Sequence, residues 1–143
     1  MMYLDTSAAI PLFVPEPISE AVEAWLAQSG DKLVTSDWLV TEFASALSIK
    51  VRRTEINKRQ ADTAWNNFFA FTQTGLHVMR VDADVFQTAA RLTRNSRSGL
   101  RAGDALHLAI ARNHRAEAIY SLDKTMLKAG KTLGLPVSRG IRL

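Results

Sequence analysis

The chain has 143 residues, of which 47% are hydrophobic and 22% charged, a composition typical of a folded domain rather than a disordered chain. It has no cysteine, which excludes disulfides, thiolate metal sites and cysteine nucleophiles. The net charge of +4 is uneven, because residues 1–49 hold seven acids and one base whereas residues 50–143 hold seventeen bases and seven acids. This basic excess favours a polyanionic partner.

Length and hydropathy limit the organisation and location of the protein. We predict a single domain over residues 1–143, because no linker, repeat or low-complexity segment interrupts the chain. No apolar run reaches 18 residues and no signal peptide is recognisable, so we expect a cytoplasmic protein without a membrane partner.

Short apolar runs alternate with segments of helical length along the chain. We predict strands at residues 2–4, 33–35, 77–79 and 118–122, with a last edge strand after Pro136. Helices are predicted at residues 19–28, 36–51, 58–74, 82–96, 103–113 and 124–133, with a short helix and a turn before the first of them. Strands separated by helices pair in parallel through right-handed crossovers, so the predicted fold class is an α/β sandwich with a central parallel sheet.

Two of the predicted strands are followed or ended by an aspartate, Asp5 and Asp123. Open parallel sheets bind ligands beyond the carboxyl ends of their strands, so both carboxylates enter one crevice if the two strands are neighbours. Each aspartate can instead cap the helix that follows it. The sequence leaves both interpretations open.

Two further acids, Asp104 and Glu42, interrupt helical faces that are otherwise apolar. Asp104 shares a face with Leu108 and Ala111 in a helix that is apolar almost all round. Aspartate is rarely buried unless it is paired. An ion pair is the alternative explanation, and Arg101 lies one turn from Asp104.

Four converging carboxylates require compensation of their charge. At an effective dielectric constant of about 20, one pair of like charges 4 Å apart costs roughly 4 kcal/mol. Protons or a divalent metal ion remove this cost, and an all-oxygen site suits Mg²⁺ or Mn²⁺ better than Zn²⁺. Mg²⁺ activates water and stabilises charge on a phosphate, so the pattern predicts phosphodiester hydrolysis of a nucleic acid.

Four short motifs surround these acids in order along the chain. They are Tyr3-Leu4-Asp5-Thr6-Ser7, Thr41-Glu42-Phe43, Gly103-Asp104-Ala105-Leu106-His107-Leu108-Ala109 and Ser121-Leu122-Asp123-Lys124. Together they resemble the PIN-domain family, and specifically VapC-type ribonuclease toxins of type II toxin–antitoxin systems. The resemblance implies a PIN-like three-layer sandwich and a Mg²⁺- or Mn²⁺-dependent endoribonuclease acting on RNA such as tRNA. It also implies a cognate antitoxin protein and a homodimer.

The resemblance also suggests roles for individual residues. It implies that Asp5, Glu42, Asp104 and Asp123 are catalytic, that the three aspartates hold the metal, and that Glu42 is a further ligand or orients the attacking water. The hydroxyl of Thr6 or Ser121 is expected to fix a carboxylate. Many relatives carry another acid two residues after the last aspartate, where this chain has Thr125, which leaves the number of metal ions open.

Arginines at residues 91, 94, 97 and 101 recur every three or four positions, and we predict that Arg94, Arg97 and Arg101 bind RNA phosphates, with a solvated stripe as the alternative. His107 is interpreted as a packed residue at the pocket edge. Two other functions stay open. One is an inactive PIN-like module that binds RNA or a partner protein. The other is a HAD-type phosphohydrolase, whose phosphatase form prefers an acid where this chain has Ser7.

Overall fold

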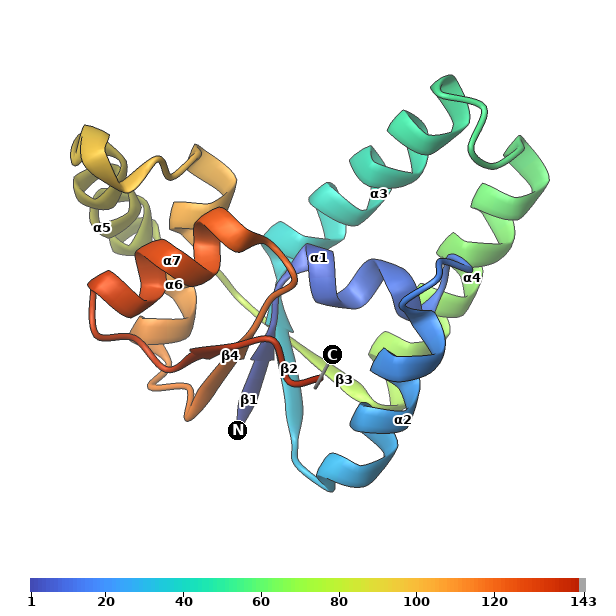
Figure 1. Cartoon of the computed structure of the whole chain (residues 1–143), viewed down its shortest axis with the longest axis horizontal. Coiled ribbons are helices and arrows are strands. Elements are labelled where there is room, and N and C mark those ends of the chain that lie inside the picture. The colour runs from blue at the N-terminus through green and yellow to red at the C-terminus, as the bar shows by residue number, and fades with distance from the viewer. Residues whose placement is uncertain (142–143) are drawn as a thin grey trace.

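The computed structural model describes residues 1–141, in which successive strands are separated by one to three helices (Figure 1). In chain order the elements are β1 (Met2–Leu4), α1 (Thr6–Ala9), the 3-10 helix η1 (Ile10–Leu12), α2 (Ser19–Ser29), β2 (Leu33–Ser36), α3 (Asp37–Arg52), α4 (Lys58–Thr74), β3 (Leu76–Met79), α5 (Ala83–Arg94), η2 (Ser96–Ser98), α6 (Ala102–Asn113), β4 (Ala118–Tyr120), α7 (Lys124–Thr132) and β5 (Val137–Ser138). The predicted elements are confirmed, with boundaries that differ by one or two residues. Residues 142 and 143, which the predicted domain includes, lie outside the described part.

The five strands form one parallel sheet in the order β3-β2-β1-β4-β5. The direction of strand addition reverses at β1, because β2 and β3 lie on one side of it and β4 and β5 on the other. Leu4 pairs with Tyr120, so Asp5 and Ser121 leave the sheet side by side. The two strands followed by Asp5 and Asp123 are therefore neighbours, at the position where such sheets bind ligands.

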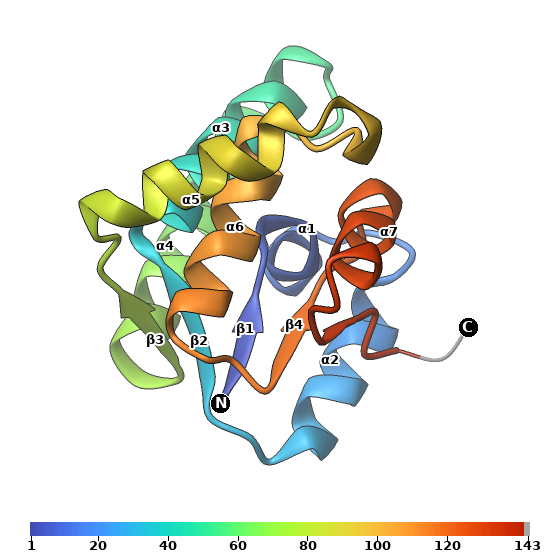
Figure 2. The same cartoon turned by 90° about the vertical axis from the view of Figure 1, so that its left-hand side faces the viewer.

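Helices cover both faces of the sheet and complete the predicted three-layer sandwich. Side chains alternate along β1, so Tyr3 points to one face while Met2 and Leu4 point to the other. The core on the Tyr3 side includes residues of α5, α6 and α7, and the opposite core includes residues of α1, α3 and α4, with α2 packed against it (Figures 1 and 2). No helix within residues 1–141 is long and apolar enough to cross a membrane.

Some side chains at the helix N-termini make capping hydrogen bonds, whereas others do not. Asn57 and Gln60 form a reciprocal capping box at the start of α4. Asp82 and Ser36 occupy the N-cap positions of α5 and α3, but neither side chain makes a capping hydrogen bond. The Ser36 hydroxyl instead contacts the Tyr3 hydroxyl at 3.0 Å, which ties α3 to the middle of the sheet.

Candidate active site

A cavity of about 590 Å³ at the carboxyl ends of β1 and β4 is lined by acids from four different parts of the chain. Asp5 follows β1, Asp123 follows β4, Glu42 lies on α3 and Asp104 lies in the first turn of α6. The other polar lining residues are Thr6, Ser7, Glu16, Arg101 and His107. The structure therefore brings together the four acids that the sequence singled out.

The carboxylate of Asp5 is buried, with 3% of the residue exposed, and is held by three donors. Ser7 Oγ and Ala8 N donate to Oδ1 at 2.8 and 3.0 Å, and Ser121 Oγ donates to Oδ2 at 2.7 Å. Burial raises the pKa of the Asp5 carboxyl, and the nearby His107 and these hydrogen bonds offset part of the rise. The position of this carboxylate is thus fixed by the protein alone.

Asp123 is connected to Asp5 through Ser121. The Ser121 hydroxyl, which donates to Asp5, also accepts a hydrogen bond from Asp123 N at 3.0 Å. Asp123 Oδ1 accepts from Met126 N at 2.8 Å and so caps α7, just as Asp5 caps α1. The two interpretations left open by the sequence hold together, because both aspartates cap helices and both line the cavity.

Glu42 belongs to a buried hydrogen-bond chain that begins at Ser36 and passes through Tyr3 and His107. Glu42 Oε2 accepts from Thr6 Oγ1 and His107 Nε2, both at 2.5 Å. His107 Nδ1 lies 2.7 Å from the Tyr3 hydroxyl, which also contacts Ser36. A neutral His107 with its proton on Nε2 satisfies both contacts, because Nδ1 then accepts from Tyr3.

The hydrogen bonds of this network keep the Glu42 carboxylate ionised. Burial acts to raise the pKa of Glu42, but the contacts with His107 and Thr6 outweigh it, so that the pKa lies below its ordinary value. Burial also raises the pKa of Tyr3, which therefore stays a hydroxyl donor at neutral pH. His107 is 2% exposed. Its packed position is confirmed, but it is more than packing, because it orients a cavity acid.

The ionised form of Asp104 is destabilised by its surroundings in the cavity. Burial raises the pKa of this half-buried carboxyl, and the charges of Asp123, Asp5 and Glu42 raise it further. Arg101 lines the same cavity, yet within residues 1–141 it forms no ion pair with Asp104. The ion pair considered as the alternative explanation for Asp104 is therefore absent from the described structure.

The donor set fits a hard divalent cation, although it is not closed around one. Among residues 1–141, no three Asp, Glu or His side chains are grouped tightly enough to hold a metal ion by themselves. Carboxylates dominate the polar lining. The charges of Asp123, Asp5 and Glu42 raise the pKa of Asp104. A cation that keeps several of its waters, as Mg²⁺ does, matches a cavity of this size and charge.

The comparison with known families decides what this fold is. The family model described as the PIN domain matches residues 2–131. The chain belongs to the PIN domain family. The resemblance carried by the four motifs is thereby confirmed, and the HAD-type alternative is removed.

Solved structures share the fold of this PIN domain at low sequence identity. VapC20 of Mycobacterium tuberculosis, described as a sarcin–ricin loop cleaving toxin, has a TM-score of 0.70 and 23% identity, over 91% of this chain and 95% of VapC20. FitAcB from Neisseria gonorrhoeae has a TM-score of 0.68 and 18% identity, over 98% of both chains. FitAB bound to a DNA fragment has a TM-score of 0.68 and 19% identity, over 100% of this chain and 97% of that one. A search of curated proteins finds no match.

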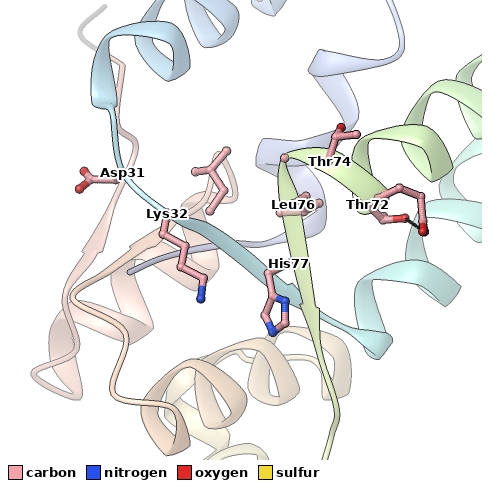
Figure 3. Close-up of a pocket in the computed structure, with 9 residues that line it drawn as sticks. Asp31, Lys32, Thr72, Thr74, Leu76 and His77 are labelled. Carbon is pink, nitrogen blue, oxygen red and sulfur yellow. Dashed lines mark hydrogen bonds between the residues drawn. The ribbon is translucent and has the colours of Figure 1, made fainter.

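Another cavity of the PIN domain, of about 290 Å³, lies at the opposite edge of the sheet, where β2 and β3 begin (Figure 3). Asp31, Lys32 and His77 are its charged or titratable lining residues. Asp31 supplies the single carboxylate of this lining. This end of the sheet therefore lacks the paired carboxylates found at the other end.

The sequence did not single out Glu16, which also lines the acidic cavity. Its carboxylate accepts from Lys50 Nζ at 2.7 Å, and Lys50 also pairs with Glu55 at 3.0 Å. The hydrogen bond to Glu16 is the main cause of a raised pKa of Lys50. Glu16 is thus neutralised by its partner, unlike Asp104.

Gly103 lets α6 approach Glu42. A Cβ atom at this position would lie 2.4 Å from Glu42 Oε1, closer than side chains tolerate. We expect Gly103→Ala to displace the Glu42 carboxylate and to lower nuclease activity about 10- to 100-fold, an effect typical of disturbed supporting contacts. Initial cleavage rates measure the effect, and circular dichroism checks the fold. Exposed Ala102 provides the control, because Ala102→Gly alters helix propensity without touching Glu42.

Proposed function

We propose that this PIN domain is a Mg²⁺-dependent endoribonuclease and the toxin of a toxin–antitoxin pair. The observation that carries the proposal is the acidic cavity, in which Asp5, Glu42, Asp104 and Asp123 meet where the strand order reverses. Membership of the PIN domain family and the folds of VapC20 and FitAB support a nuclease of this class.

Asp5, Asp104 and Asp123 would hold Mg²⁺, with Mn²⁺ as the alternative ion. A bound divalent ion supplies charge neutralisation among the carboxylates and Lewis acidity toward a phosphate oxygen and a water. The protein's own contribution is to fix the carboxylates beforehand. Ser7, Ser121 and the amide of Ala8 hold Asp5, and the amide of Met126 holds Asp123.

Glu42 would orient the attacking water. Its lowered pKa makes it a weak proton acceptor but a good acceptor of hydrogen bonds, because it is fully ionised at neutral pH. Thr6 and His107 both bind Oε2, whereas Oε1 lies against Gly103, next to the indole nitrogen of Trp38. Of the two roles suggested from the sequence, we propose positioning of the water, because the carboxylate is ionised and is held by protein donors.

Arg101 lies at the cavity and would contact the phosphate next to the cleaved bond. Arg94 and Arg97, which are exposed at the end of α5 and in η2, extend the positive charge from there. Replacing Arg94, Arg97 and Arg101 with Gln is expected to raise KM for RNA at least about 10-fold and to flatten its dependence on salt, because fewer counterions are released. Cleavage rates at several salt concentrations measure this. An unchanged salt dependence would mean that these arginines face solvent only.

The proposed partners follow from the family and from its structural neighbours. The substrate would be a structured RNA, such as a tRNA or a loop like the sarcin–ricin loop that VapC20 is described as cleaving. A cognate antitoxin protein would inhibit the nuclease, and the structurally similar FitAB is described as bound to a DNA fragment. We also propose that the protein forms a homodimer, is located in the cytoplasm and consists of a single domain over residues 1–143.

The decisive experiment uses purified protein, free of antitoxin, incubated with total RNA. Cleavage is expected with Mg²⁺ or Mn²⁺ and is expected to disappear with EDTA. Cleavage that is independent of metal would overturn the proposed chemistry. Binding of RNA without cleavage in either metal would instead establish the alternative function, an inactive RNA-binding module.

A further inference from the structure

A second charged cavity, of about 550 Å³, lies between α5 and α6. Arg91 on α5, Arg112 in the last turn of α6 and Arg115 just beyond that helix line it, and no acidic residue does. We call these three residues and the space between them the arginine cavity. Figure 2 shows α5 and α6 lying against each other on one side of the sheet.

The positive charges of the arginine cavity are uncompensated. Within residues 1–141 no arginine forms an ion pair, and the hydrogen bond from Arg91 to Thr88 Oγ1, at 3.0 Å, involves a neutral group. The acid nearest in sequence, Glu117, pairs with the amino group of Met1. Three guanidinium groups therefore surround one cavity without a counter-charge.

The backbone at Arg115 is unusual for this residue type. Arg115 has φ +54°, and hydrogen bonds from Arg115 N to Arg112 O and from Ala116 N to Ala111 O close the end of α6. Glycine or asparagine normally occupies such a left-handed position, since other residues lose folding free energy there. The helix dipole accounts for Arg112 in the last turn of α6, but it does not account for arginine rather than glycine at position 115.

We propose that the arginine cavity binds phosphates of the RNA strand that is cut in the acidic cavity, an inference that rests on the proposed function. The carboxylates of the acidic cavity repel RNA phosphates, so further cationic groups such as those of the arginine cavity would add to the binding energy supplied by the metal ion and Arg101. Guanidinium groups match phosphate oxygens in geometry and charge. Eight residues separate Asp104 from Arg112 along α6, a rise of about 12 Å. A single strand of only a few nucleotides covers that distance.

Fluorescence anisotropy with a labelled RNA that the wild-type protein cleaves tests this inference. The Asp5→Asn background keeps the RNA intact during the measurement. Replacing Arg91, Arg112 and Arg115 with Gln is expected to raise Kd at least about 10-fold at low salt. It should also reduce the slope of log K against log salt by about 2, because three phosphate contacts to a single strand are lost. The matched control replaces the exposed Arg52 at the end of α3, Arg53 just after that helix and Arg59 on α4, and changes net charge equally.

The outcomes separate the inference from the proposed function. An unchanged Kd and slope, or an equal loss in the control, overturns the arginine cavity as a binding site. If the wild-type protein cleaves RNA while the arginine cavity variant binds normally, only this inference fails. If the wild-type protein neither binds nor cleaves RNA, the proposed function fails too.

Arg115→Gly guards against unfolding as an explanation. It removes one guanidinium and relieves the left-handed backbone, so Tm is expected to rise by about 2–4 °C while RNA binding weakens. Equal or tighter RNA binding by this variant contradicts the proposal.

Discussion

Asp5→Asn is expected to lower the rate of RNA cleavage about 10³-fold while preserving the fold. Asparagine caps a helix as well as aspartate does, so α1 keeps the hydrogen bond from Ala8 N. What is lost is one negative charge among the groups proposed to hold the metal, and the loss of one preorganised electrostatic group typically costs 10²- to 10³-fold in rate. Initial rates with labelled RNA in saturating Mg²⁺ measure the effect.

The same assay applied to Asp104→Asn and Glu42→Gln should show losses of the same order. Asp84, an exposed acid in the first turn of α5, provides the matched control, and Asp84→Asn is expected to leave the rate unchanged. Rates near wild type for all three cavity variants would show that the acidic cavity is not the active site.

Asp104→Asn is expected to stabilise the metal-free protein at neutral pH. Burial and the neighbouring Asp123, Asp5 and Glu42 raise the pKa of Asp104 in the folded state, so the folded protein binds this proton more tightly than the unfolded chain does. Stability therefore falls as pH rises from about 3.9, the ordinary aspartate pKa, through the raised pKa of the folded state. Removing the charge should raise Tm in EDTA by about 2–6 °C, since about 1 kcal/mol corresponds to several degrees in a chain of this size.

Thermal unfolding in EDTA and in Mg²⁺, at pH 4.5 and 7.5, tests this expectation. The advantage of Asp104→Asn should shrink at pH 4.5. Mg²⁺ should raise the Tm of the wild-type protein, because an ion that binds only the folded state stabilises it by mass action, and should raise the Tm of the variant much less. An equal Mg²⁺ shift in both proteins would mean that Asp104 does not contribute to a metal site.

Most of the fold was predictable from periodicity, because the apolar patterns of most elements are clear. The meeting of Asp5 and Asp123 was predictable from the parallel sheet. Parallel strands place their carboxyl ends together; Asp5 directly follows β1, and Asp123 follows β4 after Ser121 and Leu122. Asp104 and Glu42 were recognisable because a carboxylate on an apolar helical face is costly without a function or a partner.

The contacts that support the acids could not be read in the same way. Tyr3 and His107 are 104 residues apart, and no local pattern indicates that their side chains meet. The available signal was that His107 is a polar residue in a helix that is otherwise apolar on every side, the same anomaly that indicated Asp104. Periodicity also grouped Arg91 with Arg97 and Arg101, but α5 ends at Arg94. Arg91 consequently faces α6, while Arg101 lies at the acidic cavity.

The double use of Asp5 and Asp123 as helix caps links the site to local opening of the chain. Helix α1 has only four residues, too few to persist without its cap and its packing. Fraying of the first turn of α1 or α7 would release a cavity acid in the same event. Amide hydrogen exchange at Ala8 and Met126, the two capped amides, therefore reports whether the carboxylates are in place. These two carboxylates therefore need no separate positioning step, because they are placed when the two helix ends form.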